Sequence, residues 1–522
     1  MAYCEGMALT ETASSEANGA SPRRWAKVVD QTRCIGCHAC TTACKSENEV
    51  PLSVTRTYVK YVDTGIFPSA QRSFQVTRCN QCADPPCVEA CPTAAMFERA
   101  DGIVDFDKSV CIGCKACIAA CPYDAIFINP ADHSAEKCNF CAHRLDIGLE
   151  PACVVVCPTE ALLVGDLADP SSRVAEIVGR DAVAVRRPEK GTRPQLYYKG
   201  ADEATLDPLA ARRPPGGIYM WSEQGDRDPG GGPAALDGWS SSAAAVLSYD
   251  IPHNRPWDFR VSLYTWTKSI AAGTYLVPLL LVAMGVLATD SPLWTLGAPL
   301  LAGTFLALTG AILIWDLEHP GRFHLIFLRP QWRSWLVRGG FVIGAFGAIL
   351  GAHLGIALHV GAVPLWIGWT GGVLALLTAV YTAFLFGQAK ARDLWQSPLL
   401  PAHFAVQAGV AGGGTTAIAA ALVGAPPDAL RAAFVVLAVS SVAHAALIAG
   451  EVLMPAPTSH ARLAEREMTR GSYRRFFAVG LLGALAGTVG TWVGWPVVPV
   501  ALLGLLAYEH AYVQAGQSVP IS

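Results

Sequence analysis

The 365 residues that follow Cys157 contain no cysteine, so all 17 cysteines of this 522-residue chain lie in its first third. The first 24 residues lack an apolar run, although a secretory signal needs an apolar core of about 7–15 residues. Arg23 and Arg24 form a twin arginine, but WAKVVDQTRC follows where a Tat signal would continue with apolar residues. We therefore expect neither export signal. We expect residues 1–24 to be a disordered tail in which Cys4 is incidental.

Charged residues are also scarce, at 16% of the chain, and the formal net charge is only −3. No basic stretch is interleaved with aromatic residues, so we expect no nucleic-acid partner. Beyond Ser269 the chain is mostly apolar, with long runs that lack Asp, Glu, Lys and Arg. These absences predict a multidomain protein, with a cysteine-rich soluble head and a membrane tail that crosses the bilayer several times.

The cysteines other than Cys4 form four quartets with related spacing. The first and third quartets have gaps of two, two and three residues, whereas the second and fourth lengthen one gap to four and to eleven. Three of the four quartets end in Cys-Pro. In chain order, the quartets are Cys34, Cys37, Cys40 and Cys44; Cys79, Cys82, Cys87 and Cys91; Cys111, Cys114, Cys117 and Cys121; and Cys138, Cys141, Cys153 and Cys157.

Three kinds of site compete for these quartets. Disulfides suit small secreted domains, and zinc usually takes two Cys-x-x-Cys pairs that lie well apart. Three cysteines in one tight loop, with a fourth after three residues, are the spacing of bacterial ferredoxins, whose fourth cysteine ligates the partner cluster. Four such motifs in tandem predict four [4Fe-4S] clusters in two ferredoxin-like α+β units of short strands and short helices. We expect no [3Fe-4S] centre, because every quartet is complete.

Residues 25–200 resemble the iron–sulfur subunits of DMSO reductase-type molybdoenzyme complexes. The resemblance rests on the four quartets, on ACKSENEVP after the first and on the long gap in the fourth. It implies that the first quartet shares its clusters with the fourth, and the second with the third. The implied ligand sets are Cys34, Cys37, Cys40 with Cys157; Cys138, Cys141, Cys153 with Cys44; Cys79, Cys82, Cys87 with Cys121; and Cys111, Cys114, Cys117 with Cys91.

The segment from Lys199 to Pro256 is polar and rich in Gly and Pro. Its composition favours a flexible tether, and the alternative is a strap laid over the head and held by Tyr219, Trp221 and Trp239. We therefore divide the chain into a tail (residues 1–24), a four-cluster domain (25–198), a linker (199–256) and a transmembrane domain (257–522).

The transmembrane domain is predicted to be an all-α bundle, because a spanning helix needs about 20 apolar residues. Residues 339–389 contain no Asp, Glu, Lys or Arg and are broken once by HVGAVP, so they predict two helices. Residues 476–508 predict another two, broken at WVGWP, although this pair has little spare length. Single helices are expected in residues 269–289, 291–315, 394–427 and 432–450, which makes about eight in total.

Basic residues in the loops predict the orientation of this bundle. Only Arg431 lies on the far side, whereas fourteen lie on the side shared with the head: Arg255, Arg260, Lys268, Arg322, Arg329, Arg333, Arg338, Lys390, Arg392, Arg462, Arg466, Arg470, Arg474 and Arg475. The positive-inside rule then places the head in the cytoplasm of a prokaryotic cell, at the inner membrane. A rival explanation is that these basic loops face the head because they dock it.

Residues 257–522 resemble the NrfD/polysulfide-reductase-type membrane subunits. The resemblance rests on SLYTWTKSIAAGTYL, LIWDLEHPGRFHLIF, WQSPLLPAHF and AYEHAYVQAGQSVPIS. It implies eight or more helices, no haem, and a pocket for quinone or menaquinone near the iron–sulfur side.

A quinone site needs an apolar slot with polar groups that hold both ring oxygens and exchange protons. The charged end of the second predicted helix, next to the head, meets this requirement. Snorkelling or lipid binding is the alternative for Lys268 and Arg322, and a loop-satisfied histidine is the alternative for His319. The candidate quinone residues are Tyr264, Lys268, Asp316, Glu318, His319, Arg322 and His324.

Few ionisable groups lie deeper in the tail. His353 and His444 are the only attractive pair for a haem, and the weak spacing signal leads us to expect none. Glu451 and Glu509 could relay protons, or pair with Arg462 or Arg474 near the surface.

No stretch of the sequence provides a pterin-binding domain, so we expect the substrate-converting site on another chain and no such site here. The leading hypothesis is an electron-transfer and membrane-anchor subunit that connects the quinone pool to a molybdenum or tungsten bis-pterin catalytic subunit. One alternative is the equivalent module of a hydrogenase complex. The other is a redox-linked ion transporter, which would need broken helices and several mid-membrane acids.

Overall fold

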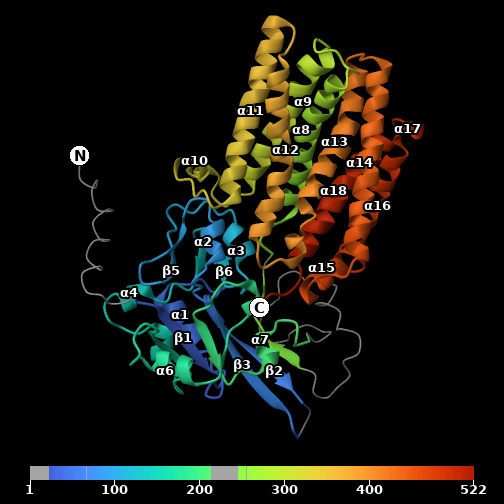
Figure 1. The fold of residues 1–522 in the computed structure, drawn as a ribbon. Helices are drawn as coiled ribbons and strands as arrows, with labels where there is room; N and C mark the ends of the chain where they lie inside the picture. Colours follow the sequence, from blue (N-terminus) through green and yellow to red (C-terminus); the bar gives the residue numbers. More distant parts are fainter. Residues whose placement is uncertain (1–22, 66–67, 213–244, 254) are drawn as a thin grey trace, which may run out of the picture.

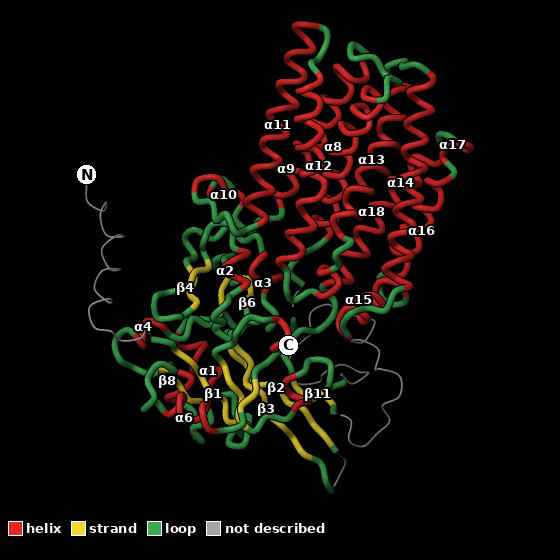
Figure 2. Tube along the Cα trace, viewed as in Figure 1, coloured by secondary structure: helices red, strands yellow, loops and turns green. Residues whose placement is uncertain are grey.

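The computed structural model of the chain describes residues 23–65, 68–212, 245–253 and 255–522. A strand-containing head sits against one end of a bundle of long helices (Figure 1). The strands are confined to the head, as Figure 2 shows, and the carboxyl terminus returns to the junction between the two parts. The α+β head and the helical membrane domain predicted from the sequence are confirmed.

The larger sheet of the head has the strand order β8-β1-β10-β9. Its central strand is β1, which pairs antiparallel with β8 and parallel with β10. Apolar residues occupy both faces of β1 because Ala26 and Val28 pack under α6, while Val29 faces the cysteine region. The elements are β1 (Trp25–Asp30), β8 (Leu162–Asp166), α6 (Arg173–Arg180), β9 (Val183–Ala184) and β10 (Leu196–Lys199).

The second sheet incorporates part of the predicted linker. Its strands β2 (Thr57–Thr64) and β3 (Gln71–Arg78) form a hairpin, and β11 (Val246–Tyr249) adds to the free edge of β2. A short helix, α7 (Glu203–Leu206), also lies within the predicted linker. The tether prediction is therefore wrong for residues 245–253, which read AVLSYDIPH, lack the glycines of the segment before them and include a strand that pairs with β2. Tyr219, Trp221 and Trp239 lie outside the described residues, as do Cys4 and almost all of the predicted tail.

Short helices follow the cysteine loops, and the sequence explains where they begin and end. The glycines of the two Cys-Ile-Gly-Cys motifs, Gly36 and Gly113, both have a φ of 69°, which a side chain would disfavour. Helices α2 and α3 end at Cys91 and Cys121, whose extended backbone is the conformation expected before proline. The helices are α1 (Ala39–Glu47), α2 (Pro86–Ala90), α3 (Ala116–Ala120), α4 (Ala142–Leu145) and α5 (Ala152–Val155), and the hairpins are β4 (Met96–Glu98) with β5 (Val104–Phe106) and β6 (Ile126–Ile128) with β7 (Ala135–Lys137).

Seven helices in the described part of the chain are long and apolar enough to cross a membrane. The sequence predicts about eight, and the difference is α16, which has only 15 residues and is followed after a break by the four-residue α17. The first span also begins ten residues earlier than predicted, because its polar start is already helical. The bundle comprises α8 (Phe259–Ala283), α9 (Ala298–Trp315), α11 (Trp335–Val360), α12 (Leu365–Gln388), α13 (Leu400–Leu422), α14 (Pro427–Leu453), α16 (Arg474–Thr488), α17 (Gly490–Val493) and α18 (Val497–Gly516), with the shorter α10 (Leu325–Leu328) and α15 (Ser459–Thr469) beside the head.

Helix α8 lies in the interior of the bundle, with 78% of its most apolar window buried against 22% for α11. Small residues allow this packing. A Cβ atom on Gly273 would lie 2.0 Å from the carbonyl oxygen of Ala408, so α8 and α13 touch through their backbones. Leu358, Trp366 and Trp492 point outward on other helices and are more than 65% exposed, as expected for side chains that face lipid.

The head and the bundle are joined by several direct contacts. The hydroxyl of Ser334 donates to the carbonyl oxygen of Ala90, and Trp257 Nε1 donates to that of Cys114 at 3.3 Å. His253 hydrogen bonds Asp124 in the head and Asp250 in the linker. Burial opposes protonation of this imidazole, but the two carboxylates outweigh burial and raise the pKa of His253 to about 9.

Candidate functional site

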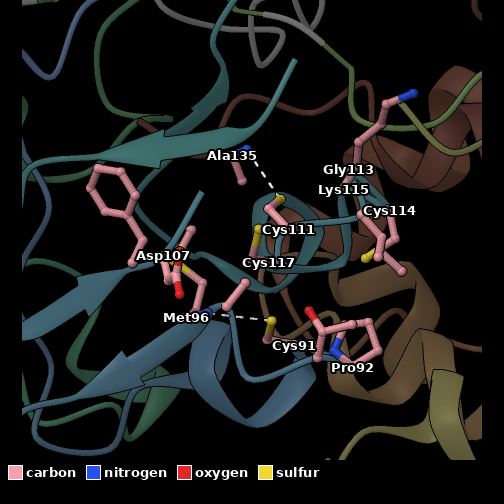
Figure 3. A pocket seen from close by; sticks show the side chains of 14 residues that line it. Cys91, Pro92, Met96, Asp107, Cys111, Gly113, Cys114, Lys115, Cys117 and Ala135 are labelled. Carbon is pink, nitrogen blue, oxygen red and sulfur yellow. Dashed lines mark hydrogen bonds between the residues drawn. The ribbon is translucent and has the colours of Figure 1, made fainter. Parts of the chain in front are cut away.

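Four cysteines line one pocket at the membrane end of the head (Figure 3). Cys111, Cys114 and Cys117 come from one loop, and Cys91 comes from the end of α2. The pocket holds about 370 Å³ of space not filled by protein atoms, part of it open to solvent.

A second pocket, of about 330 Å³, is lined by Cys34, Cys37, Cys40 and Cys157. Its cysteines are again three from one loop and one from a distant part of the sequence. Cys37 is exposed, and Cys34 and Cys157 are half-buried. This pocket therefore opens at the head's surface. The cysteines in each of the two pockets are those that the resemblance groups into one ligand set.

The other eight cysteines lie near one another in two groups. Burial raises the pKa of Cys44 to about 12, with Cys138, Cys153 and Cys141 contributing through their negative charge. Burial likewise raises the pKa of Cys121 to about 12, with a contribution from Cys79. Thiols with such high pKa values need nearby cationic metal to ionise, because neighbouring thiolates repel one another. Cys82 and Cys87 complete the group around Cys79 and Cys121.

The residues present fit a polynuclear cluster better than a single ion. Within the described ranges, no three Cys, His, Asp or Glu side chains converge tightly enough to hold one metal ion. The thiols instead surround a cavity, as a [4Fe-4S] cube requires. Backbone N–H groups also point at the sulfurs: that of Met96 lies 3.4 Å from Cys91, that of Ala135 lies 3.4 Å from Cys111 and that of Ala161 lies 3.2 Å from Cys157.

Two buried cations lie against Cys153, and sequence reasoning missed both. Arg78 Nη1 donates to Cys153 Sγ at 3.0 Å, and Lys27 Nζ lies 3.9 Å from the same sulfur. Both side chains are 2% exposed, and Arg78 Nε and Nη2 have no hydrogen-bond partner among the described residues. Burial opposes ionisation of Cys153, but the charge of Arg78 and Lys27 lowers the pKa of this thiol to about 7. The available signal was Lys27 in the largely apolar β1, whereas Arg78 ends the mostly polar β3 and nothing in the sequence singles it out.

Six of the seven predicted quinone residues fall into two groups, and the first group holds the head. Glu318 pairs with Lys115 at 2.9 Å and packs on Gly113, where a Cβ atom would lie 2.3 Å from that of Glu318. His319 Nε2 lies 3.2 Å from Ser134 Oγ. The guanidinium of Arg322 donates to the carbonyl oxygens of Lys108 and Cys111 at 2.9 and 3.0 Å. His324 is exposed and hydrogen bonds within its own loop, through the carbonyl oxygen of Gly321.

The second group lies at the head-side end of the bundle and just inside it. Asp316 is 8% exposed, and burial raises the pKa of its carboxyl to about 6. Its Oδ1 lies 3.7 Å from Arg260 Nε and has no hydrogen-bond partner in the described part of the chain. Lys268 is fully buried and donates to the carbonyl oxygen of Ala379 at 2.8 Å and to Thr382 Oγ1 at 2.6 Å, so it does not snorkel to the membrane surface. Tyr264, one turn before Lys268 on α8, is also buried.

The deeper ionisable groups have partners that differ from those expected. Glu451 contacts His403 at 3.3 Å, whereas the sequence suggested Arg462 or Arg474 as its partner. His403 lies within WQSPLLPAHF, one turn into an apolar helix, but sequence reasoning did not single it out. Both ring nitrogens of His353 hydrogen bond, to Tyr275 and to the carbonyl oxygen of Trp294, so neither is free to ligate haem iron.

Comparison with known proteins identifies two domains in this chain. Residues 70–167 match the model of the 4Fe-4S dicluster domain, and residues 249–490 match that of the polysulphide reductase NrfD family. The second match begins at the last residue of β11, so the head's second sheet reaches the start of the membrane domain.

Relatives cover the head. The tetrathionate reductase B subunit of Salmonella typhimurium is 44% identical over 219 residues, which are 40% of this chain and 85% of that protein. The polysulfide reductase B chain of Wolinella succinogenes is 42% identical over 178 residues, 34% of this chain and 93% of the relative. Protein NrfC of Escherichia coli is 42% identical over 177 residues, 33% of this chain and 79% of the relative. The protein therefore belongs to the family of 4Fe-4S iron–sulfur subunits that includes these two reductase subunits and NrfC, and it carries an NrfD membrane domain in the same polypeptide.

Proposed function

We propose that this chain transfers electrons between a membrane quinone and a separate catalytic subunit, through four [4Fe-4S] clusters, and anchors that subunit to the membrane. The observation that carries the proposal is the contact between a cysteine loop and the membrane domain. Glu318 packs on Gly113, and Arg322 binds the carbonyl oxygen of Cys111. A cluster held by this loop would lie directly beside the end of α9, where a lipid-soluble carrier can approach.

The ligand sets follow the two pockets and the two neighbouring groups of cysteines. The pocket at the membrane end would hold the first cluster, and the surface pocket the last. The two groups between them would hold the second and third clusters. The proposed sets, from the membrane outward, are Cys91, Cys111, Cys114 and Cys117; Cys79, Cys82, Cys87 and Cys121; Cys44, Cys138, Cys141 and Cys153; and Cys34, Cys37, Cys40 and Cys157.

Electrostatic interactions between thiols of different sets support this order. The Cys117 thiol lies within electrostatic range of Cys87, which links the first set to the second. Cys79 lies within range of Cys138, which links the second to the third. Cys40 interacts with Cys153 in the same way, which links the third to the fourth. Four cubes held in this order would pass single electrons along the head in either direction.

For the quinone site we propose Asp316 and Tyr264, with Lys268 behind them. Quinol oxidation releases two protons and two electrons, so the site needs a proton acceptor within reach of a cluster. Asp316 meets this need, because it is buried, lies directly after α9 and has one oxygen without a hydrogen bond from any described residue. Glu318, His319 and Arg322 act by holding the head in position. A quinone or menaquinone would be an exchangeable substrate and no haem would take part.

The catalytic partner would dock at the outer end of the head. Ile35 and Val155 lie close in sequence to cysteines of the surface pocket and are 56% and 58% exposed, and Leu149 is 47% exposed. Exposed apolar side chains near the pocket that opens at the head's surface are typical of a protein interface. The relatives are named for tetrathionate, polysulfide and dimethyl sulfoxide reductases, and a molybdenum or tungsten bis-pterin subunit is the partner that this resemblance supports.

The head is proposed to lie on the cytoplasmic side. Most basic loop residues share its side, as the positive-inside rule requires. Docking accounts for Arg322, which binds the head, whereas Arg392 binds the carbonyl oxygens of Gln517 and Val519 at the end of the membrane domain itself. The arginines of α15, which include Arg462 and Arg466, support the orientation instead.

The test uses the full chain purified in detergent after anaerobic reconstitution. Sixteen irons per chain, four for each of four clusters, and bleaching of the cluster absorbance by a reduced quinone analogue are the expected results. Far fewer irons, or clusters that are neither reduced by a quinol nor, once reduced, oxidised by a quinone, would refute the proposal. Mass spectrometry of the co-purifying subunit distinguishes a pterin enzyme from a hydrogenase.

A further inference from the structure

A cluster of polar side chains lies inside the bundle, apart from the residues proposed to contact quinone. We call it the inner polar cluster, and it consists of His403 on α13, His444 and Glu451 on α14, and Tyr508 on α18. His403 Nε2 lies 3.3 Å from Glu451 Oε2, and Tyr508 OH lies 3.4 Å from the same oxygen. His403 stacks on Tyr508, and His444 meets the edge of both rings.

Burying these polar groups costs free energy of folding, which suggests that they have a functional role. His403, His444 and Tyr508 are at most 2% exposed, and neither ring nitrogen of His444 has a hydrogen-bond partner in the described ranges. A buried polar group without a partner costs about 1–3 kcal/mol. Ionisable groups within membrane segments most often mark proton or ion pathways. Two imidazoles, a carboxylate and a phenol in contact can all accept and release protons.

A chain of polar side chains connects this cluster to the proposed quinone site. Tyr264 interacts electrostatically with both Asp316 and Glu509. Lys268, one turn deeper on α8, also interacts electrostatically with Glu509. Glu509 in turn has Gln407 as a hydrogen-bonding neighbour and interacts electrostatically with His403. Neither the Oε1 of Glu509 nor that of Gln407 has a hydrogen-bond partner among the residues described. Both oxygens can therefore accept a hydrogen bond from a group that brings a proton to this site.

The other end of the chain opens toward the head side. Glu451 is two residues from the end of α14, its side chain is 12% exposed, and its Oε1 accepts a hydrogen bond from Ser397 in the loop before α13. His444 lies nine residues from that end, about 14 Å at 1.5 Å per residue. The polar groups thus run from the interior to the head-side surface.

We propose that the inner polar cluster is a proton conduit, which exchanges the two protons of the quinone reaction with solvent on the head side through Glu451. The proposal rests on the proposed quinone function. When quinol is oxidised, its two electrons pass singly to the clusters, and its two O–H protons pass by way of Tyr264, Lys268 and Glu509 to His403 and Glu451. Quinone reduction runs the same steps in reverse.

The test compares Glu451→Gln with wild type in the reconstituted full chain. Stopped-flow absorbance follows cluster reduction by a reduced quinone analogue across a range of pH. In wild type the rate should rise with pH, because deprotonated acceptors take the quinol protons. Glu451→Gln should slow reduction at least tenfold and flatten the pH profile, with unchanged iron content and unchanged affinity for the analogue, and Glu451→Asp should recover most of the rate.

His353→Gln is the matched control, because His353 is buried in the same domain and its nitrogens already hydrogen bond outside the inner polar cluster. Its rate should stay within twofold of wild type. A rate of cluster reduction in Glu451→Gln within twofold of wild type would refute the conduit. So would a variant whose only defect is weaker binding of the quinone analogue. If wild type itself were not reduced by quinol, the quinone function would fail, and the conduit with it.

Discussion

Replacing Arg78 by glutamine should lower one reduction potential most, that of the cluster proposed on Cys153, and should lower that of the cluster proposed on Cys34 and Cys40 less, because Arg78 also interacts with these two thiols. The guanidinium of Arg78 donates to Cys153 Sγ at 3.0 Å inside the protein, so its charge stabilises the more negative, reduced form of the cluster that Cys153 is proposed to ligate. A hydrogen bond to a charged group contributes about 1.5–3 kcal/mol. In a one-electron couple, 59 mV corresponds to a tenfold change, or about 1.4 kcal/mol. The expected fall is therefore roughly 60–130 mV, toward the lower end because Lys27 remains beside the same sulfur.

The measurement is a redox titration followed by electron paramagnetic resonance of the full chain. Arg72→Gln is the matched control, because Arg72 lies on the same strand, is 48% exposed and pairs with Asp63 at the surface. Arg78→Lys keeps the positive charge, so its cluster potential should fall less than that of Arg78→Gln. Four unchanged potentials in a fully loaded Arg78→Gln protein would refute the electrostatic argument. An equal fall in all four would point instead to a general change in the head.

Three further outcomes are expected. Asp316→Asn should slow quinol-driven cluster reduction at least tenfold while iron content and the resonance spectra stay unchanged; an unchanged rate would leave Asp316 as an anchoring residue. Gly273→Val should lower the melting temperature of the detergent-solubilised bundle sharply or prevent its folding, whereas Gly303→Ala, with open space around the added methyl group, should not. The raised pKa of His253, about 9, means that its carboxylate pairs add stability fully below the unfolded value near 6.5, and that this contribution is lost as pH rises through about 9. At pH 6, His253→Gln should thus have a lower melting temperature than wild type, by an amount that reflects roughly 2–4 kcal/mol, whereas at pH 10 the two melting temperatures should be close.

Local patterns carried most of the prediction. Cysteine spacing, the glycine in each Cys-Ile-Gly-Cys loop and the proline after Cys91 and Cys121 act over a few residues, so the head's loops and short helices follow from them. The long apolar runs likewise predict the bundle, apart from α16, which is too short to span alone.

The features that could not be predicted from the sequence depend on contacts between residues far apart in the chain. Glu318 and Arg322 have the same charge whether they face a quinone or a neighbouring loop, and only the folded structure brings them against Gly113 and Cys111. The edge of β2 that recruits β11 is nearly two hundred residues away in the chain. Arg78 sits in an ordinary strand pattern, and its nearness to Cys153 depends on the packing of the whole head.

The pairing of β11 with β2 has a mechanical consequence. Together with the contacts of Glu318, Arg322 and Ser334, it fixes the head to the bundle at several well-separated points. A carrier domain that swings between donor and acceptor needs a free hinge, and these attachments remove it. These attachments suit a stationary relay, so under the proposed function the electron-transfer rate should be insensitive to solvent viscosity, and turnover should be limited by the exchange of quinone and protons at the membrane end.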